Sequence, residues 1–276
     1  MATHKLVPTA TDYGTLRKGL VPHPMALAAS LDQTTLRSLL FPLAWQANRF
    51  VLDDFEGDTL NTFLWTVDGD TGTTSFAIPA AASTVAGSII AGNTAGDDNE
   101  AISIYGHPTL CGDKNAGMAV RFKFDDVTDI FFETGLTDPL TDYTLPAIND
   151  IDTPTITNGA VTVAVIAMDT DQTLKTAALI TDGNATYATA KTDFGTWSPT
   201  ANIWYTAIVQ TDGDDVFAYI YNTDDARQPI LVSGGAKSAV SAFEGGTLVQ
   251  PWFIAGNRTT DGGLPVLDFL AYWAER

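Results

Sequence analysis

The stretch that decides the fold is AVRFKF at residues 119–124, where apolar and charged side chains alternate. A period of two is the pattern of a β-strand with one buried face and one exposed face. The pattern predicts that Val120, Phe122 and Phe124 point into a core. It places Arg121 and Lys123 on the opposite face.

Similar short segments occur on both sides of this strand. Turns rich in Asp, Gly and Asn separate them, and hardly any helical period is found after residue 50. The turn at residues 212–214 predicts a hairpin between its two flanking strands. The expected strands are residues 51–55, 119–124, 129–136, 160–168, 173–181, 204–211, 216–221, 251–255 and 264–273. Many short strands with such turns predict one all-β sandwich or barrel over residues 50–276.

Residues 1–49 have a different character and form a separate N-terminal arm. Their four prolines exclude regular helix over most of the arm, but leucine spacing between Pro24 and Pro42 predicts one short amphipathic helix. The arm either folds back onto its own domain or docks on a neighbouring subunit. The residues that would dock are Leu27, Leu31, Leu36, Leu39, Phe41 and Trp45.

Charge divides the chain in the same place. The first 50 residues carry a net charge of +3 and the remaining residues -22, which together give -19 and a pI near 4.1. This balance argues against a nucleic-acid-binding surface over most of the molecule, because phosphates need clustered cations. The single cysteine, Cys111, excludes an intrachain disulfide framework and a cysteine-based zinc site. No secretory signal and no apolar run long enough for a membrane span are visible, so a soluble chain made in a cytoplasm is expected.

Both ends of the β-region resemble a known family. Residues 53–65 run from Asp-Phe through a glycine-containing turn to a Leu and a Trp, which is similar to the opening of concanavalin A-like, or LamG-like, jelly-roll domains. Residues 266–276 resemble the last strand of these domains, which pairs beside the first. The segments at 121–124 and 132–136 resemble tailed-phage virion proteins of this fold. The resemblance implies a concanavalin A-like jelly-roll β-sandwich.

The resemblance also raises the question of hydrolysis, because some members of the superfamily cleave β-glucans. Those enzymes carry a Glu-x-Asp-x-x-Glu strand, whose alternate positions bring two carboxyl groups to about 5 Å. The five glutamates here lie far apart, and Glu133 has no carboxylate two or four positions later. We therefore expect no enzymatic activity, with a carboxylate pair from different strands as the alternative.

Asp-rich turns are the candidate metal ligands. They lie at residues 68–70, 97–100, 169–171 and 212–215, and none reproduces a twelve-residue calcium loop. Asp and Gly are also the ordinary residues of turns between strands, and we favour that interpretation. If a calcium ion is bound, Asp97, Asp98 and Glu100 form the densest cluster. No other cofactor is expected.

Exposed aromatic rings would be needed to bind a glycan, because their faces pack on the apolar face of a sugar. Most tryptophans and tyrosines fall in expected strands, where we assign them to the core. Trp197 and Tyr143 lie in loops and are the candidates for glycan contact.

Three functions follow, in this order. The first is a non-enzymatic structural protein of a phage virion, a capsid decoration or cement protein assembled in the host cytoplasm and attached through its arm. Its partners would be the major capsid protein or other virion proteins and further copies of itself, with no nucleic acid and no membrane. The second is a glycan-binding module for adhesion or receptor binding on the same particle. The third is a glycoside hydrolase.

Overall fold

The computed structural model of the chain describes a β-sandwich. The described residues are 49–55, 60–70, 76, 89–90, 100–112, 114–160, 162–173, 175–182, 189–211, 215–224, 230–231, 236–238, 247–259, 263 and 265–274. Within these ranges every regular element is a strand, so the expected all-β class is confirmed there. No helix that could cross a membrane occurs among them.

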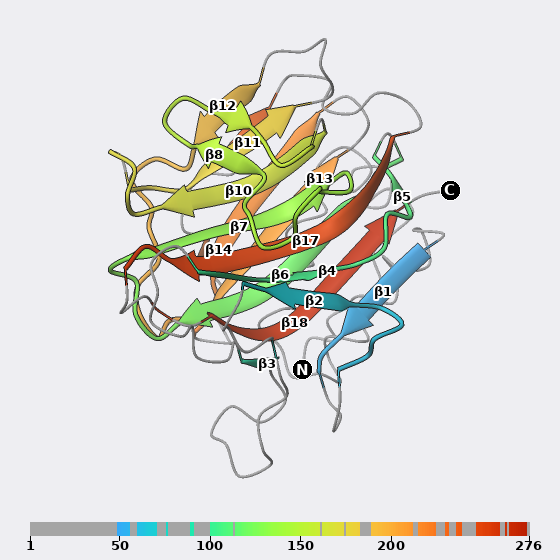
Figure 1. The fold of residues 1–276 in the computed structure, drawn as a ribbon, viewed down its shortest axis with the longest axis horizontal. Coiled ribbons are helices and arrows are strands. Elements are labelled where there is room, and N and C mark those ends of the chain that lie inside the picture. Colours follow the sequence, from blue (N-terminus) through green and yellow to red (C-terminus); the bar gives the residue numbers. More distant parts are fainter. Residues whose placement is uncertain are drawn as a thin grey trace, which may run out of the picture.

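One layer of the sandwich, sheet A, has the order β1-β18-β6-β13-β14-β15, with β3 beside β18 and β16 beside β14. Neighbouring strands are antiparallel, and β1 pairs with β18 at the edge (Figure 1). The strands of sheet A are β1 (Arg49–Asp53), β3 (Ile89–Ile90), β6 (Gly117–Phe124), β13 (Tyr205–Thr211), β14 (Val216–Asn222), β15 (Ile230–Leu231), β16 (Ala236–Ser238) and β18 (Pro265–Ala274).

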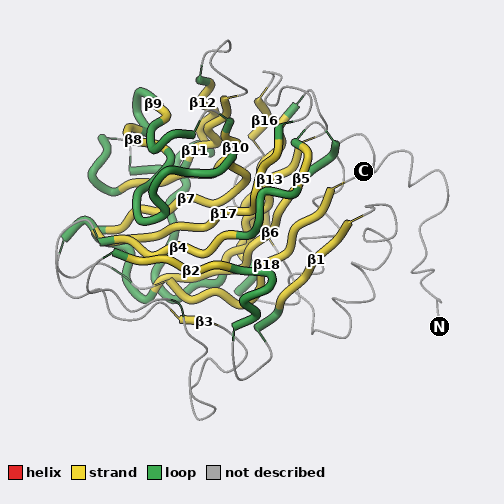
Figure 2. The backbone as a smooth tube through the Cα atoms, turned by 45° about the vertical axis from the view of Figure 1, so that its right-hand side comes forward, coloured by secondary structure: helices red, strands yellow, loops and turns green. Residues whose placement is uncertain are grey.

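The second layer, sheet B, has the order β12-β11-β10-β7-β17-β4-β2, with β5 beside β17. It lies in front of sheet A in Figure 1, and Figure 2 shows the two layers from a second direction. A separate two-stranded sheet, β8 with β9, packs on the outer face of β10 and β11, where Ile148 shares an apolar cluster with Ala167 and Ile180. The strands are β2 (Thr66–Gly69), β4 (Ala101–Tyr105), β5 (Leu110–Cys111), β7 (Ile130–Thr137), β8 (Ile148–Asp150), β9 (Thr155–Ile156), β10 (Val163–Asp169), β11 (Ala178–Asp182), β12 (Ala190–Asp193) and β17 (Leu248–Asn257).

The alternation in β6 is confirmed. Val120, Phe122 and Phe124 are buried in the core between the sheets, where Phe122 reaches Phe132 of sheet B with 5.3 Å between ring centroids. Arg121 and Lys123 take the other face, and each lies over the ring of Trp204, at 4.6 and 4.8 Å from its centroid. The charged face of β6 is therefore held by cation–π contacts.

The expected strand positions are correct in outline. The hairpin of β13 and β14 forms as predicted, in register from Tyr205↔Asn222 to Thr211↔Val216. The strand expected over residues 173–181 is wrong in its first half, because β11 begins only at Ala178. Lys175 has a φ of 49°, which a strand residue cannot adopt, so the chain turns there before it enters the sheet.

The family-like motif at residues 53–65 has a physical role. The Asp53 carboxylate accepts hydrogen bonds from Trp65 Nε1 at 2.9 Å and from the amide of Phe55 at 3.0 Å. The buried Trp65 ring packs edge-on against Tyr272 of β18, with 5.6 Å between ring centroids. The first and last strands are thus joined through one indole.

Replacing Asp53 by alanine is expected to lower the free energy of unfolding by about 2 kcal/mol, because it leaves the buried Trp65 N–H without its acceptor. Urea-induced unfolding followed by tryptophan fluorescence measures this change. Phe63→Ala in the same loop is the control, since its ring is 90% exposed and its loss is expected to change stability by under about 0.5 kcal/mol. Equal effects of the two substitutions would contradict the role of Asp53.

Candidate functional site

Residues 138–160, which we call the strap, cover the outer face of sheet B. The strap begins and ends side by side, since the amide of Asp138 donates to the carbonyl of Thr162 at 3.0 Å. Its apolar residues form a second core with the outer side chains of β10, β11 and β17. The strap contributes Leu140, Ala147, Ile148, Ile151 and Ala160, and the sheet contributes Val163, Val165, Ala167, Ala178, Ile180, Trp252 and Ile254.

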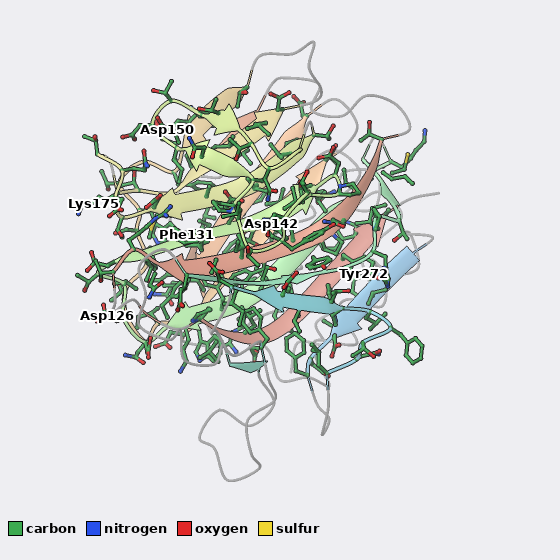
Figure 3. All side chains as sticks on the ribbon, in the orientation of Figure 1. Asp126, Phe131, Asp142, Asp150, Lys175 and Tyr272 are labelled. Carbon is green, nitrogen blue, oxygen red and sulfur yellow. The ribbon has the colours of Figure 1, made fainter. Side chains whose placement is uncertain are left out.

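A clasp around Asn158 shapes the strap. The Asn158 side chain accepts from the amide of Asp142 at 2.8 Å and donates to the carbonyls of Asp142 and Leu145. The position needs an Asn because its φ is 58°, a left-handed conformation that Asn tolerates. Gly159 follows with a φ of 74°, and a Cβ there would lie 2.2 Å from Thr141 Oγ1. Figure 3 shows Asp142 over the front of sheet B.

Glu133 anchors the strap to the middle of the sheet. Because Ile130, Phe132 and Leu136 of β7 face the inner core, Phe131 and Glu133 face the strap. The Glu133 carboxylate accepts from the amide of Ala147 at 2.9 Å and from that of Ile148 at 2.8 Å. It also accepts from Trp252 Nε1 at 3.3 Å.

Burial dominates the protonation of this carboxyl group. It raises the pKa of Glu133 from an ordinary value of 4.5 to about 7, while the three N–H donors and, more weakly, Arg258 act in the opposite direction. Both oxygens face N–H donors, and the group is fully enclosed by sheet and strap. Glu133 therefore has the geometry of a structural anchor. In this conformation it has no access to a substrate.

Two tyrosines stack at the edge of the strap, and we call them the tyrosine shelf. Tyr143 of the strap lies on Tyr105 of β4, with ring centroids 3.7 Å apart and the planes 10° from parallel. Both rings are half-buried, and among the described residues the only other ring that they contact is the buried Trp252. Gln250 Nε2 donates to the Tyr143 hydroxyl at 3.3 Å.

Polar groups on β2 and β4 surround the shelf. Because Asp68 pairs with Ser103 in the ladder and Tyr105 follows two positions later, all three share one face of sheet B. Burial, then Tyr143 and Asp68, raise the pKa of Tyr105 to about 12, and a hydrogen bond with Thr66 works against them. Ser103 Oγ is buried and has no hydrogen-bond partner among the described residues. The shelf thus combines flat apolar faces with hydroxyl and carboxylate groups.

The second predicted glycan contact, Trp197, is not part of this site. The expectation of an exposed ring is wrong, because Trp197 is only 8% exposed and packs edge-on against Tyr205 in the inner core. Although residues 194–200 contain no strand, the backbone of Trp197 is bound to Phe194 and Ala177, which draws its ring inward. Tyr143 is half-exposed, as its loop position predicted.

In the Asp-rich turns that lie within the described residues, the carboxylates make ion pairs and hydrogen bonds to nearby backbone amides. Asp169 pairs with Arg258 and accepts from the amide of Asp171, and Asp68 accepts from the amide of Gly69 at 2.9 Å. Of the predicted calcium cluster, Glu100 is buried at the start of β4, while Asp97 and Asp98 lie outside the described residues. Across the ranges given above, no three His, Cys, Asp or Glu side chains gather as metal ligands.

The short helix predicted in the docking arm lies outside the described residues, and so do the predicted docking residues Leu27, Leu31, Leu36, Leu39, Phe41 and Trp45.

Sequence reasoning missed Tyr105 and the anchoring role of Glu133. A signal for Tyr105 was present, because the apolar positions 102 and 104 imply that residues 103 and 105 share the other face of a strand. No local signal places Tyr143 on Tyr105, since the strap between β7 and β10 brings them together.

Comparison with known proteins supports the fold. No protein-family model matches the sequence, and no curated protein matches it. Peanut lectin in complex with a nine-residue peptide is 13% identical, with a TM-score of 0.51, and the match covers 81% of this chain and 97% of that one. The Lotus tetragonolobus seed lectin is 9% identical with a TM-score of 0.52, over 81% of this chain and 97% of that one. Lectin UEA-II in complex with galactose is 10% identical with a TM-score of 0.50, over 83% of this chain and 100% of that one.

At such low identities the likeness establishes the fold. The described part of the chain has the same jelly-roll sandwich fold as these lectins, which is the concanavalin A-like fold that the two end motifs predicted.

Proposed function

We propose that the sandwich is a carbohydrate-binding module and that the tyrosine shelf is its contact site. The observation that carries the proposal is the stacked pair of half-buried tyrosines, Tyr143 on Tyr105, beside the carboxylate of Asp68. Apolar aromatic faces with a few fixed polar groups are the usual composition of a small-molecule site. The lectin fold, including the member that was solved with galactose, is consistent with this use.

The charge near the shelf favours a neutral sugar. Burial and Tyr143 are the larger causes of the raised pKa of Tyr105, but Asp68 is close enough to contribute to it, and residues 51–276 have a net charge of -22. An acidic sugar would be repelled, whereas a neutral pyranose can pack its C–H face on a ring and donate hydroxyl protons to the carboxylate. The Tyr105 hydroxyl stays neutral at physiological pH and can donate or accept.

We propose further that the module is not an enzyme. Glu133, the glutamate that the sequence analysis considered for hydrolysis, has both carboxylate oxygens engaged by strap amides. A retaining hydrolase needs two carboxyl groups facing a sugar about 5 Å apart. Hydrolysis of a bound glycan that is lost in a Glu133→Gln variant would overturn this view.

Loss of the Tyr143 ring is expected to weaken sugar binding. A glycan array followed by calorimetric titration should find a neutral ligand, and Tyr143→Ala should lower its affinity by about tenfold or more, since tenfold corresponds to 1.4 kcal/mol. Tyr219→Ala is the matched control, because Tyr219 is also half-exposed and stacks on a second tyrosine, Tyr221, but lies on sheet A. An array without neutral hits, or equal losses in both variants, would contradict the proposal.

A structural role in a phage virion is the second candidate. It is favoured by the step from a +3 arm to a -22 body and by the sequence resemblance to virion proteins. The arm joins the sandwich at β1, where Phe50 and Leu52 pack on an apolar cluster on the outer face of sheet A. In this role the module would decorate a capsid, attached through its N-terminal arm to capsid or other virion proteins, and could still bind a glycan.

The virion role has its own test. If it is right, mass spectrometry of purified phage particles from the source will detect peptides of this chain in stoichiometric amounts. Particles assembled with a variant that begins at Arg49 will lack the chain. Particles without these peptides, or normal decoration by the shortened chain, would overturn the role.

A further inference from the structure

The segment that carries Tyr143 is held at both ends. On one side the Asn158 side chain binds the backbone of Asp142 and Leu145. On the other side Glu133 binds the amides of Ala147 and Ile148. Tyr143 lies between the clasped residues Asp142 and Leu145 and four positions before Ala147, so its position on Tyr105 depends on both attachments.

The two attachments differ in chemistry. The Asn158 clasp is uncharged and lies within the strap, whereas Glu133 is the ionisable group that ties this part of the strap to sheet B. The strap faces Glu133 with N–H groups, β10 faces it with Ala167, and β17 faces it with Trp252 and Ile254. The charged groups nearby are Arg258, after β17, and the Asp169 with which it pairs at the end of β10.

We infer that Glu133 is the positioning residue of the tyrosine shelf: its carboxyl group holds the strap on sheet B and so sets Tyr143 against Tyr105, and the strap opens more readily when that group is charged. The inference rests on the proposed function only where it concerns a ligand. Glu133 itself touches no sugar and acts through the strap.

The direction of the pH effect follows from burial. With the strap closed the pKa of Glu133 is about 7, and with the strap lifted water returns it toward 4.5. The closed form therefore binds the proton more tightly, so that raising the pH through this window favours opening. Between pH 5 and pH 8 the opening equilibrium should increase by about 70-fold.

Hydrogen exchange of backbone amides in the full chain tests the inference without any ligand. The intrinsic exchange rates of the Ala147 and Ile148 amides at each pH are divided by the measured rates, which gives the protection factor. Protection should fall by about 70-fold from pH 5 to pH 8.

Two controls separate this local effect from a loss of stability across the whole protein. In Glu133→Gln, which cannot titrate, the protection factors of these amides should not change with pH. The amide of Thr223, which donates to Trp204 beside sheet A, should keep its protection in both proteins. Protection at Ala147 that is independent of pH in the wild type, or a Glu133→Gln variant that keeps the pH dependence, would overturn the inference.

The affinity for a sugar tests whether Glu133 also positions Tyr143 for binding. For a neutral ligand found on the array, Glu133→Gln at pH 5 should raise Kd by roughly threefold to tenfold, because the shelf is assembled in only part of the population. An unchanged Kd with lost protection would overturn the positioning role and leave the binding site intact. If no sugar binds, the exchange experiment still decides whether Glu133 controls the strap, so the two proposals fail separately.

Discussion

Replacing Gly135 by alanine is expected to lower the free energy of unfolding by more than about 4 kcal/mol, or to prevent folding. Gly135 lies in the middle of β7, paired with Val165 of β10 and Trp252 of β17. Its φ of 155° is rarely adopted by residues with a side chain, and a Cβ would lie 2.1 Å from the carbonyl oxygen of Ala164. Because the obstacle is backbone in the centre of a sheet, no side chain can move to make room.

Urea-induced unfolding and the yield of soluble protein measure this effect. Gly69→Ala, in the edge strand β2 of the same sheet, is the control and should change stability by less than about 1 kcal/mol. A Gly135→Ala variant that unfolds at the wild-type urea concentration would show that β7 and β10 do not pair as described.

The stability of the protein should also fall as the pH rises, and Glu133 should be a main cause. Its pKa is raised from 4.5 to about 7 in the folded protein, so the folded state holds the proton more tightly than the unfolded chain. The contribution is fully present below pH 4.5 and is lost as the pH rises through 7. From pH 5 to pH 8 this amounts to about 2 to 3 kcal/mol.

Glu133→Gln isolates this contribution from the other acidic groups. The difference in unfolding free energy between the wild type and the variant should shift by about 2 to 3 kcal/mol against the wild type between pH 5 and pH 8. The variant keeps nearly the same shape but places an amide N–H₂ against strap N–H groups, so it should be the less stable protein at pH 5. A difference that is constant with pH would mean that the carboxyl group is not buried.

The strands of the two sheets could be predicted because the order of apolar and polar residues within each strand indicates which side chains are buried. The alternation around Phe122 and the run at residues 129–136 indicate strands from local pattern alone. The opening motif at residues 53–65 was informative because it encodes the hydrogen bond from Trp65 to Asp53, which links β1 of sheet A to the start of β2 in sheet B. The start of β11 was missed, since residues 173–177 carry ordinary strand formers and the turn at Lys175 depends on neighbouring loops.

The site was less predictable for a physical reason. A loop tyrosine such as Tyr143 is a fair candidate for a contact, but the residue beneath it belongs to β4, 38 positions earlier in the sequence. Trp197 has a similar loop context, and yet its ring is buried against Tyr205. Glu133 has no sequence signal as an anchor, because its partners are backbone amides of the strap. Such contacts depend on how the strap crosses sheet B.

The central claim, a sugar site on the tyrosine shelf, is tested most directly by nuclear magnetic resonance of ring-labelled tyrosines during titration with a neutral sugar. The account predicts that the resonances of Tyr105 and Tyr143 shift together and saturate, while those of Tyr219 and Tyr221 stay in place. Saturating shifts at Tyr219 and Tyr221 with none at Tyr105 and Tyr143, or no shifts with any neutral sugar, would contradict it.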